Sequence, residues 1–357
     1  MKNFVLQVVT GRRRGLAAAL AKPALSVLSV LYRLGHGLRR LLYKAGFFQS
    51  VKLPVPVISV GNITTGGTGK SPFVELLGHW FEEHGLRAAI LSRGYGRVAG
   101  TTIDDEPLSA PSPQLMRLAG SNRVRLARQA LDTFKPDVIL LDDGFQHYRI
   151  HRDLDIVLVD AVNPFSNGRV LPRGLLRERA KALQRAHLIV VTRSDQIDPT
   201  RLETIRAMLS RVSGGKPLVE GAHKPIELEA PVETRRVPLE WLRTRELVAF
   251  SGIGNPDAFK LTLESLGANV VSHVIYPDHH TYTPSEIRGL NLHAKEFMAE
   301  GLVTTVKDAT KLPYDAFEVP LFVLKVEMRL GRGRELLEEK LAEVAGLTRA
   351  PAETSVS

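Results

Sequence analysis

The sequence is 357 residues long, enough for two domains, and its 44% apolar and 24% charged residues are typical of a globular protein with an ample core. It has no cysteine, which excludes disulfides and thiolate metal sites. The formal net charge is +10, and the excess lies at the amino end, because 11 of the 48 Lys and Arg residues precede Glu75, the first acidic residue. Such a basic arm favours an anionic partner, either nucleic acid or an anionic membrane surface.

The pattern of residues 27–45 favours the membrane. Apolar side chains recur with the spacing of one helix face, at Val27, Leu31, Leu34, Leu38, Leu41, Leu42 and Ala45. The opposite face of the expected helix carries Arg33, His36, Arg39, Arg40 and Lys44. An apolar stripe backed by cations indicates a helix that lies in a membrane interface, so we interpret residues 1–50 as a basic amphipathic docking arm.

Three other interpretations of the arm stay open. A transmembrane span over residues 15–32 is nearly long enough, but Lys22-Pro23 interrupts its apolar run. A signal peptide could have Arg12–Arg14 as its charged region, and it would carry the rest of the chain out of the cell. An ordinary amphipathic helix would pack its apolar stripe on the domain.

The next segments predict a parallel α/β sheet. Apolar runs at 55–62, 88–97, 137–147, 154–161 and 187–195 have the composition of buried strands, and 73–85 has that of a helix. Strands that alternate with helices indicate a parallel sheet covered on both faces, which we place at residues 51–225. Ligands bind at the carboxyl ends of such strands, where polar residues and glycines follow these runs.

A second α/β series follows a change in sequence composition. Residues 224–242 are proline-punctuated and read as a linker or hairpin, after which apolar runs return at 246–259, 268–282 and 301–312. We therefore expect a smaller α/β domain at 226–345 that closes the cleft, and a flexible tail at 346–357.

The stretch VGNITTGGTGKSP (60–72) resembles a phosphate-binding loop with one departure. The usual pattern, G-x-x-x-x-G-K-[ST], requires glycine at position 64, where this chain has Thr64. The deviant pattern, K-G-G-x-G-K-[ST], begins with a signature lysine, where this chain has Thr65. The groups that bind phosphate and Mg²⁺ are nevertheless present. The glycines let backbone amides surround phosphate oxygens, Lys70 supplies a positive charge, and the Ser71 hydroxyl can reach Mg²⁺. We therefore predict a P-loop NTPase-like fold for residues 51–225. Its nucleotide-binding loop consists of Thr64, Thr65, Gly66, Gly67, Thr68, Gly69, Lys70 and Ser71.

Acidic and imidazole groups stand at three other strand ends. Asp142 and Asp143 follow a buried strand, the place where P-loop enzymes hold Mg²⁺, so we predict that Ser71 and these carboxylates bind the metal. The cluster DDEP (104–107) is a carboxylate group or a solvated turn. The cluster PDHH (277–280) is an Asp–His base pair, a metal site of the kind found in DHH phosphoesterases, or a plain loop.

Taken together, the motifs resemble the tetraacyldisaccharide 4'-kinases, the lipid A 4'-kinases of Gram-negative bacteria. The resemblance runs in order from about residue 30 to 315, through VGNITTGGTGKSP, LSRGYGR, DEP, LLDDGFQH, NPFSNGRVLPRGLLRE (163–178), FSGIGNP, YPDHHTY and TTVKDA. This family also lacks the first glycine of the loop. The resemblance implies ATP and Mg²⁺ as cofactors, an acylated disaccharide 1-phosphate lipid as substrate, and a place at the cytoplasmic face of the bacterial inner membrane.

The resemblance also implies roles for particular residues. Asp105 matches the acid that acts as base on the sugar hydroxyl, and His279 matches its partner across the domain cleft. Arg177 and Glu178 match a further active-site pair, and Lys70 matches the lysine that acts on the ATP phosphates. Asp104 replaces the family's usual glycine before D-E-P, so the choice between Asp104 and Asp105 stays open. Val306 replaces a glutamate in T-E-K-D-A, so any charge role at that position is absent here.

The implied activity is transfer of the γ-phosphoryl group of ATP to the 4'-hydroxyl of the tetraacylated glucosamine disaccharide 1-phosphate in lipid A (lipopolysaccharide) biosynthesis. The alternative is a membrane-docking P-loop GTPase or ATPase, since VVTRSD (190–195) stands where GTPases carry N-K-x-D. Thr192 and Arg193 replace the Asn and Lys of that motif, which argues against GTP. We expect no nucleic-acid partner, because the leucine stripe has no obvious use in nucleic-acid binding and the arm shows no aromatic pattern that suggests base stacking.

Overall fold

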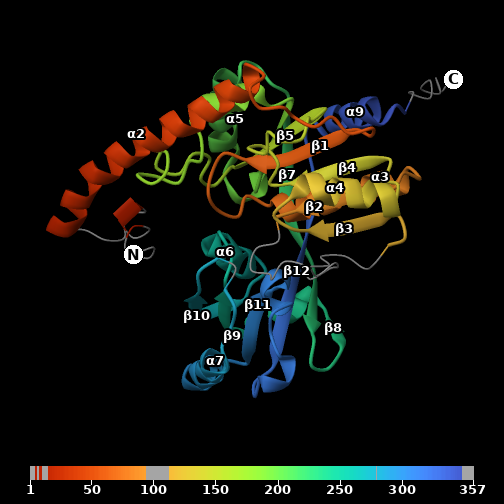
Figure 1. The fold of residues 1–357 in the computed structure, drawn as a ribbon. Helices are drawn as coiled ribbons and strands as arrows, with labels where there is room; N and C mark the ends of the chain where they lie inside the picture. The colour runs from red at the N-terminus through yellow and green to blue at the C-terminus, as the bar shows by residue number, and fades with distance from the viewer. Residues whose placement is uncertain (1–4, 6–7, 10–14, 94–111, 279, 348–357) are drawn as a thin grey trace. The chain divides into compact units, whose positions relative to one another are not determined.

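The computed structural model describes residues 5, 8–9, 15–93, 112–278 and 280–347, which form two compact units (Figure 1). The first unit contains residues 15–93, 112–222 and 330–347, and the second contains 223–278 and 280–329. The chain crosses the boundary between them within two long strands, β7 (Leu218–Ala230) and β12 (Leu321–Leu330). Asp104, Asp105, His279 and residues 348–357 of the expected tail lie outside the described residues.

The first unit is built on a parallel sheet in the order β7-β6-β5-β1-β4-β2-β3. Its remaining strands are β1 (Val57–Asn62), β2 (Ala88–Ser92), β3 (Leu115–Ala119), β4 (Val138–Asp142), β5 (Leu154–Asp160) and β6 (Leu188–Thr192). Strand β1 is central, with Ile58 opposite Leu140 on one side and Leu154 on the other. The expected parallel sheet is confirmed, and the edge strand β3 was not anticipated.

Helices cover both faces of this sheet. They are α3 (Lys70–Glu83), α4 (Arg123–Thr133), α5 (Pro199–Ser213) and α9 (Arg334–Ala345). Along β2, Ala89 and Leu91 pack in one core cluster with α4, whereas Ile90 lies against Gly78 of α3. Because successive side chains of a strand point to opposite faces, α3 and α4 lie on opposite faces of the sheet. Helix α9, which the sequence analysis grouped with the second domain, groups with the first unit.

The second unit is a smaller α/β layer. Its parallel strands have the order β10-β9-β11-β12, where β9 is Glu246–Ser251, β10 is Asn269–Ile275 and β11 is Gly301–Thr305. The short strand β8 (Arg235–Val237) pairs antiparallel with the end of β7, so the 224–242 segment is a hairpin. Helices α6 (Pro256–Ser265) and α7 (Pro284–Glu296) and the single turn α8 (Val306–Ala309) follow the strands.

The amino-terminal arm of the first unit forms one long helix, α2 (Leu16–Lys44). Lys22-Pro23 interrupts the apolar run but does not end the helix, which continues through Pro23. The Ser26 hydroxyl donates to the Lys22 carbonyl at 2.9 Å. In the described part of the chain, α2 is the one helix long and apolar enough to cross a membrane, judged by length and composition.

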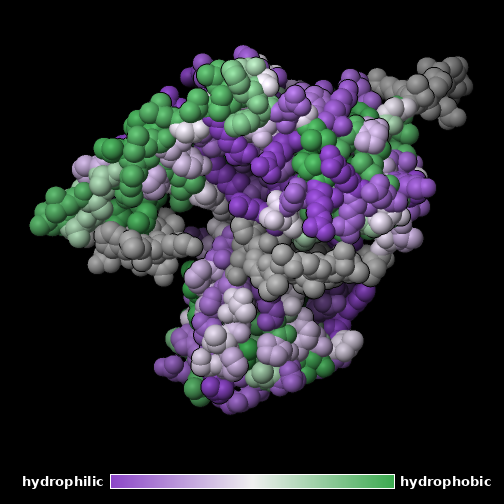
Figure 2. Space-filling view, in the orientation of Figure 1, coloured by the Kyte–Doolittle hydropathy of each residue, from purple (hydrophilic) through white to green (hydrophobic). Residues whose placement is uncertain are grey.

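The apolar stripe of α2 faces outward. Leu31, Leu34 and Leu38 are 59%, 64% and 58% exposed, and Figure 2 shows the hydrophobic surface along this helix. The interpretation in which this stripe packs on the domain is therefore wrong. The protein-facing side instead carries the buried Ala18, Leu25 and Ser29, and the Ser29 hydroxyl donates to the Val170 carbonyl at 2.8 Å.

Gly61 near the end of β1 lets the segment after β4 approach closely. A Cβ at this position would lie 2.5 Å from the Cβ of Phe145 and 2.8 Å from its backbone nitrogen. Because Phe145 is fully buried and the obstacle includes backbone, neither side can move away cheaply.

We expect Gly61→Ala to lower the free energy of unfolding by about 3 kcal/mol, at the upper end of the cost of overpacking a core. Thermal and urea unfolding of the purified protein measure it. The matched control is Gly35→Ala, a helix position where an added Cβ meets nothing within 4 Å; it should be neutral or stabilising by up to about 1 kcal/mol. Equal stability of the two variants would contradict the packing argument.

Candidate active site

The start of the glycine loop is held in an extended conformation, which explains how Thr64 can replace glycine. Thr64 forms an antiparallel bridge with Leu176, and both the amide and the hydroxyl of Thr65 donate to the Leu175 carbonyl, at 2.7 and 3.0 Å. Any residue can adopt an extended backbone, so no glycine is needed at position 64. The left-handed conformations come later, at Gly66 (φ 136°) and Gly69 (φ 81°).

The loop leads directly into helix α3. Gly69 is its N-cap residue, and no described side chain caps it, so the first amides of the helix remain available to an anion. Inside the loop, the Asn62 amide group donates to the Thr68 hydroxyl at 2.9 Å and, more weakly, to the Gly66 carbonyl at 3.4 Å. The Lys70 ammonium lies 3.6 Å from a carboxylate oxygen of Asp143.

Asp142 at the end of β4 faces Ser71. The Ser71 hydroxyl donates to Oδ2 of Asp142 at 3.5 Å, while Oδ1 is buried and accepts no hydrogen bond from any described residue. Burial raises the pKa of Asp142 above its usual range, although the Lys70 charge partly offsets this effect. A hydroxyl and a buried carboxylate with an unused oxygen fit a hard cation such as Mg²⁺.

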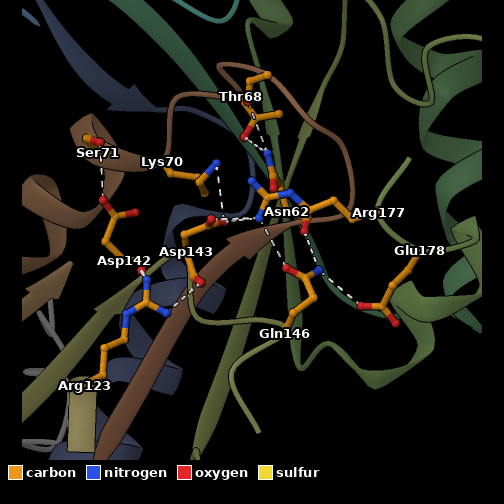
Figure 3. Close-up of polar contacts among 11 residues, drawn as sticks. Asn62, Thr68, Lys70, Ser71, Arg123, Asp142, Asp143, Gln146, Arg177 and Glu178 are labelled. Atoms are coloured by element: carbon orange, nitrogen blue, oxygen red, sulfur yellow. Dashed lines mark hydrogen bonds and ion pairs between the residues drawn. The ribbon is translucent and has the colours of Figure 1, made fainter. Parts of the chain in front are cut away.

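Asp143, the next residue, has the opposite electrostatic environment. Its carboxylate accepts hydrogen bonds from one terminal nitrogen of Arg177, at 2.8 and 2.7 Å, and its backbone is left-handed (φ 55°) (Figure 3). Burial alone would raise the pKa of Asp143, but the charges of Lys70 and Arg177 more than offset it and hold the pKa below its usual range. Asp143 is thus an ionised carboxylate engaged by two cations.

Glu178 lies in a second ion pair beside the first. Its carboxylate is 8% exposed and accepts two hydrogen bonds from Arg185, at 2.7 and 2.8 Å. The Gln146 amide group links it to the loop, because it donates to Glu178 at 3.1 Å and to the Asn62 carbonyl at 2.9 Å. Burial would raise the pKa of Glu178, but the hydrogen bonds and charge of Arg185 more than offset it, so the pKa lies below its usual range.

Three site residues were not singled out from the sequence. Asn62 and Gln146 lie within the quoted motifs VGN and DDGFQH, so their positions were visible although their roles were not. Arg123 lies in no motif; its guanidinium donates to the backbone carbonyls of Asp142 and Asp143, at 2.7 and 3.2 Å, and fixes the end of β4 (Figure 3). Only proximity in the fold reveals it.

The structure thus brings most of the predicted site residues together in the first unit. The glycine loop, Asp142, Asp143, Arg177 and Glu178 share the carboxyl edge of the parallel sheet (Figure 3). Within the part of the chain that is described, no three His, Asp or Glu side chains gather so as to hold a metal ion by themselves. Mg²⁺ commonly completes its shell with water and substrate phosphates, so Ser71 and Asp142 would be sufficient protein ligands.

In the second unit, the remaining motifs converge on Asp308. This buried carboxylate accepts hydrogen bonds from the Gly252 amide at 3.1 Å and the Thr305 hydroxyl at 2.8 Å. The residues on either side of position 279 contact different partners. Asp278 pairs with Lys307 at 3.0 Å, and His280 lies 3.1 Å from Glu286. FSGIGNP, YPDHHTY and TTVKDA therefore belong to one local structure.

Comparison with known proteins matches these observations. The family model described as tetraacyldisaccharide-1-P 4'-kinase (LpxK) matches residues 21–345. The chain belongs to this family. Curated relatives named tetraacyldisaccharide 4'-kinase include those of Syntrophus aciditrophicus, 41% identical over 86% of this chain and 88% of the relative, and of Anaeromyxobacter sp. strain Fw109-5, 38% identical over 95% and 96%.

A solved structure agrees with the fold of the family member described here. The structure of LpxK from Aquifex aeolicus in complex with ATP is 31% identical and covers 91% of this chain and 99% of its own, with a TM-score of 0.67. The predicted P-loop-like α/β fold and the kinase family are confirmed.

The depressed pKa of Glu178 makes its contribution to stability depend on pH. We expect Glu178→Gln to lower the free energy of unfolding at pH 7 by roughly 2 kcal/mol, because the amide loses the charge-assisted bonds to Arg185. A carboxyl with a lowered folded-state pKa stabilises the protein above its usual pKa of 4.5 and loses this effect as pH falls through the folded value. The difference in free energy of unfolding between wild type and Glu178→Gln should therefore become smaller below about pH 4.

Urea unfolding between pH 3 and 7 tests this expectation. The matched control is Glu203→Gln, whose carboxylate pairs with Arg206 but is largely exposed, and which should have little effect at any pH. A Glu178→Gln difference that stayed constant with pH would refute the ionised pair.

Proposed function

We propose that this chain transfers the γ-phosphoryl group of ATP to the 4'-hydroxyl of a tetraacylated glucosamine disaccharide 1-phosphate. The observation that carries the proposal is the glycine loop, which keeps a phosphate-binding form without its first glycine and faces Lys70, Ser71 and Asp142. Membership of the 4'-kinase family supplies the substrate class. Family membership also favours this activity over a membrane-docking GTPase or ATPase.

In this proposal the loop amides and Lys70 bind the phosphate chain. Phosphoryl transfer depends mainly on positioning and electrostatics, because its transition state is loose. Ser71 and Asp142 would hold Mg²⁺, which supplies charge neutralisation when bound. Asp143 is engaged by Lys70 and Arg177, so we assign it to orienting these two cations toward the phosphates.

We further propose that Asp105 and His279 accept the proton of the sugar hydroxyl, as the family resemblance implies. Both residues lie outside the described part of the chain. On either side of position 279, Asp278 is paired with Lys307 and His280 with Glu286. Val306, at the start of α8, leaves the charge of the family's glutamate absent.

The two faces of α2 support docking of this enzyme at an anionic membrane surface. Its outward leucines are exposed, while its inner face touches the segment that carries the site: Ser29 binds the Val170 carbonyl, and His36 lies 4.0 Å from Glu178. An acylated substrate stays in the bilayer, so a helix of this kind would hold the site beside the substrate's headgroup. We propose that the protein is a peripheral or monotopic protein at the cytoplasmic face of the bacterial inner membrane.

We expect Lys70→Ala to reduce phosphorylation of the lipid by roughly 100-fold or more, because one charge aimed at the transferring group is lost. The assay follows labelled ATP, or labelled GTP, into the lipid phase with and without the acylated disaccharide. The control is Lys216→Ala, a half-buried lysine at the other end of the sheet, which should keep activity. Undiminished labelling and ATP affinity in Lys70→Ala would refute the kinase proposal, and label released only as free phosphate would favour the ATPase alternative.

We expect the triple variant Leu31→Ser, Leu34→Ser, Leu38→Ser to raise the KM for lipid in anionic vesicles by roughly tenfold or more, because each buried leucine contributes about 1.5–3 kcal/mol to an apolar contact. The KM for ATP should stay unchanged, since these side chains point away from the protein. This variant is sharper than deletion of residues 1–46, which would also remove Ser29 and His36 from the site.

The control for the outward leucines is Leu292→Ser with Leu336→Ser, two exposed leucines on α7 and α9. Vesicle flotation of the same proteins measures binding directly. Equal rises in the two KM values, or unchanged flotation of the triple variant, would overturn the docking role.

A further inference from the structure

Two residues that follow one another at the end of β6 hold the outer side of the glycine loop. The Thr192 hydroxyl donates to the Thr68 carbonyl at 3.0 Å, and a terminal nitrogen of Arg193 donates to the Gly67 carbonyl at 2.7 Å. Both residues belong to the first unit, and Thr192 is fully buried. These bonds join VVTRSD to the loop, a link that the sequence did not reveal.

Holding these carbonyls also sets the direction of two amides. In a trans peptide the carbonyl and the following N–H point in opposite directions. The Gly67 carbonyl turned toward Arg193 therefore directs the Thr68 amide away from β6, and the Thr68 carbonyl turned toward Thr192 does the same for the Gly69 amide. Amides directed in this way are the donors that a phosphate-binding loop needs.

The loop needs such restraint because of its glycines. Gly67 precedes one of the two peptide units, and Gly69 follows the other, so the backbone itself offers little resistance to rotation of either unit. The Asn62 side chain, at the end of β1, also holds the loop: its amide group donates to the Thr68 hydroxyl at 2.9 Å and to the Gly66 carbonyl at 3.4 Å. Thr192 and Arg193 hold the two peptide units themselves, through the Thr68 and Gly67 carbonyls.

Arg193 is kept in place at a cost that points to function. It is 6% exposed, its Nε donates to Asp160 at 3.0 Å, and its terminal nitrogen forms a second bond to the same carboxylate. Its backbone is left-handed, with φ 55°. A buried ion pair is weak evidence for stability alone, and backbone strain tends to gather at functional sites.

We propose that Arg193, oriented by Asp160, and Thr192 are positioning residues that preset the Thr68 and Gly69 amides for the phosphates of ATP. Neither side chain needs to touch the nucleotide, because each acts through a backbone carbonyl of the loop. P-loop GTPases recognise guanine with residues at this strand end. In this chain, residues at the same strand end position the glycine loop instead. The inference rests on the proposed phosphate-binding role of that loop.

The experiment compares Thr192→Val, Arg193→Gln and Arg193→Lys with wild type in full-length protein. It measures kcat, the KM for ATP, the KM for lipid and the melting temperature. Thr192→Val keeps the side-chain shape and removes one hydrogen bond, so the KM for ATP should rise about tenfold, with the KM for lipid unchanged. Arg193→Gln should raise it further, and Arg193→Lys should restore part of the loss because an ammonium can still bind one carbonyl.

The matched control is Arg206→Gln, which breaks an Arg–Glu contact between α5 and β7 in the same unit. It should lower the melting temperature without changing the KM for ATP. Should Arg193→Gln fail to fold, Thr192→Val alone decides the matter. A KM for ATP within twofold of wild type in Thr192→Val, or equal rises for ATP and lipid in all variants including Arg206→Gln, would overturn the inference.

The Lys70→Ala variant separates this inference from the proposed function. If Lys70→Ala leaves ATP affinity unchanged, the phosphate-binding role fails and takes the inference with it. If Lys70→Ala loses activity while Thr192→Val keeps wild-type affinity for ATP, only the positioning role of the β6 residues is wrong.

Discussion

The glycine loop after β1 is held from outside, and the rest of the site depends on this restraint. Its first residues are bonded to Leu175 and Leu176, and its middle carbonyls are bonded to Thr192 and Arg193. A loop rich in glycine cannot fix its own amides, because glycine allows many backbone conformations. The restraint comes from two chain segments more than 100 residues further on, so the site exists only once the sheet has assembled.

The same edge of the sheet separates two adjacent carboxylates into different roles. Asp142 is buried against Ser71 and has one unused oxygen, whereas Asp143 is surrounded by Lys70 and Arg177. Burial raises the pKa of the first, and the two cations lower that of the second. The sequence predicts both as metal ligands; in the structure the left-handed backbone at Asp143 directs the two side chains to different partners.

The sequence was sufficient for the features that local patterns control. Apolar runs located the central strands, and the glycines with Lys70 and Ser71 located the loop, because these signals lie within a few residues of each other. Edge strand β3 was missed because its partly exposed residues give no continuous apolar run. The grouping of α9, the ties from Arg123 and Arg193, and the choice of partner for each aspartate depend on contacts between distant segments, which no single stretch encodes.

Helix α2 shows how one pattern can be recognised correctly and its surroundings misjudged. The leucine stripe was evident, and the cations opposite it were taken as one charged face. In the structure His36 belongs to the inner side: burial lowers its pKa, with Glu178 only partly offsetting this, so near pH 7 it is mainly neutral. Arg39, Arg40 and Lys44 remain exposed near the helix's carboxyl end, and Lys22 is exposed near its start, so positive charge is available to anionic lipid at both ends of the helix. The proposed docking surface is therefore a long apolar stripe flanked by exposed cations, without the contribution from His36 that the helical pattern alone suggested.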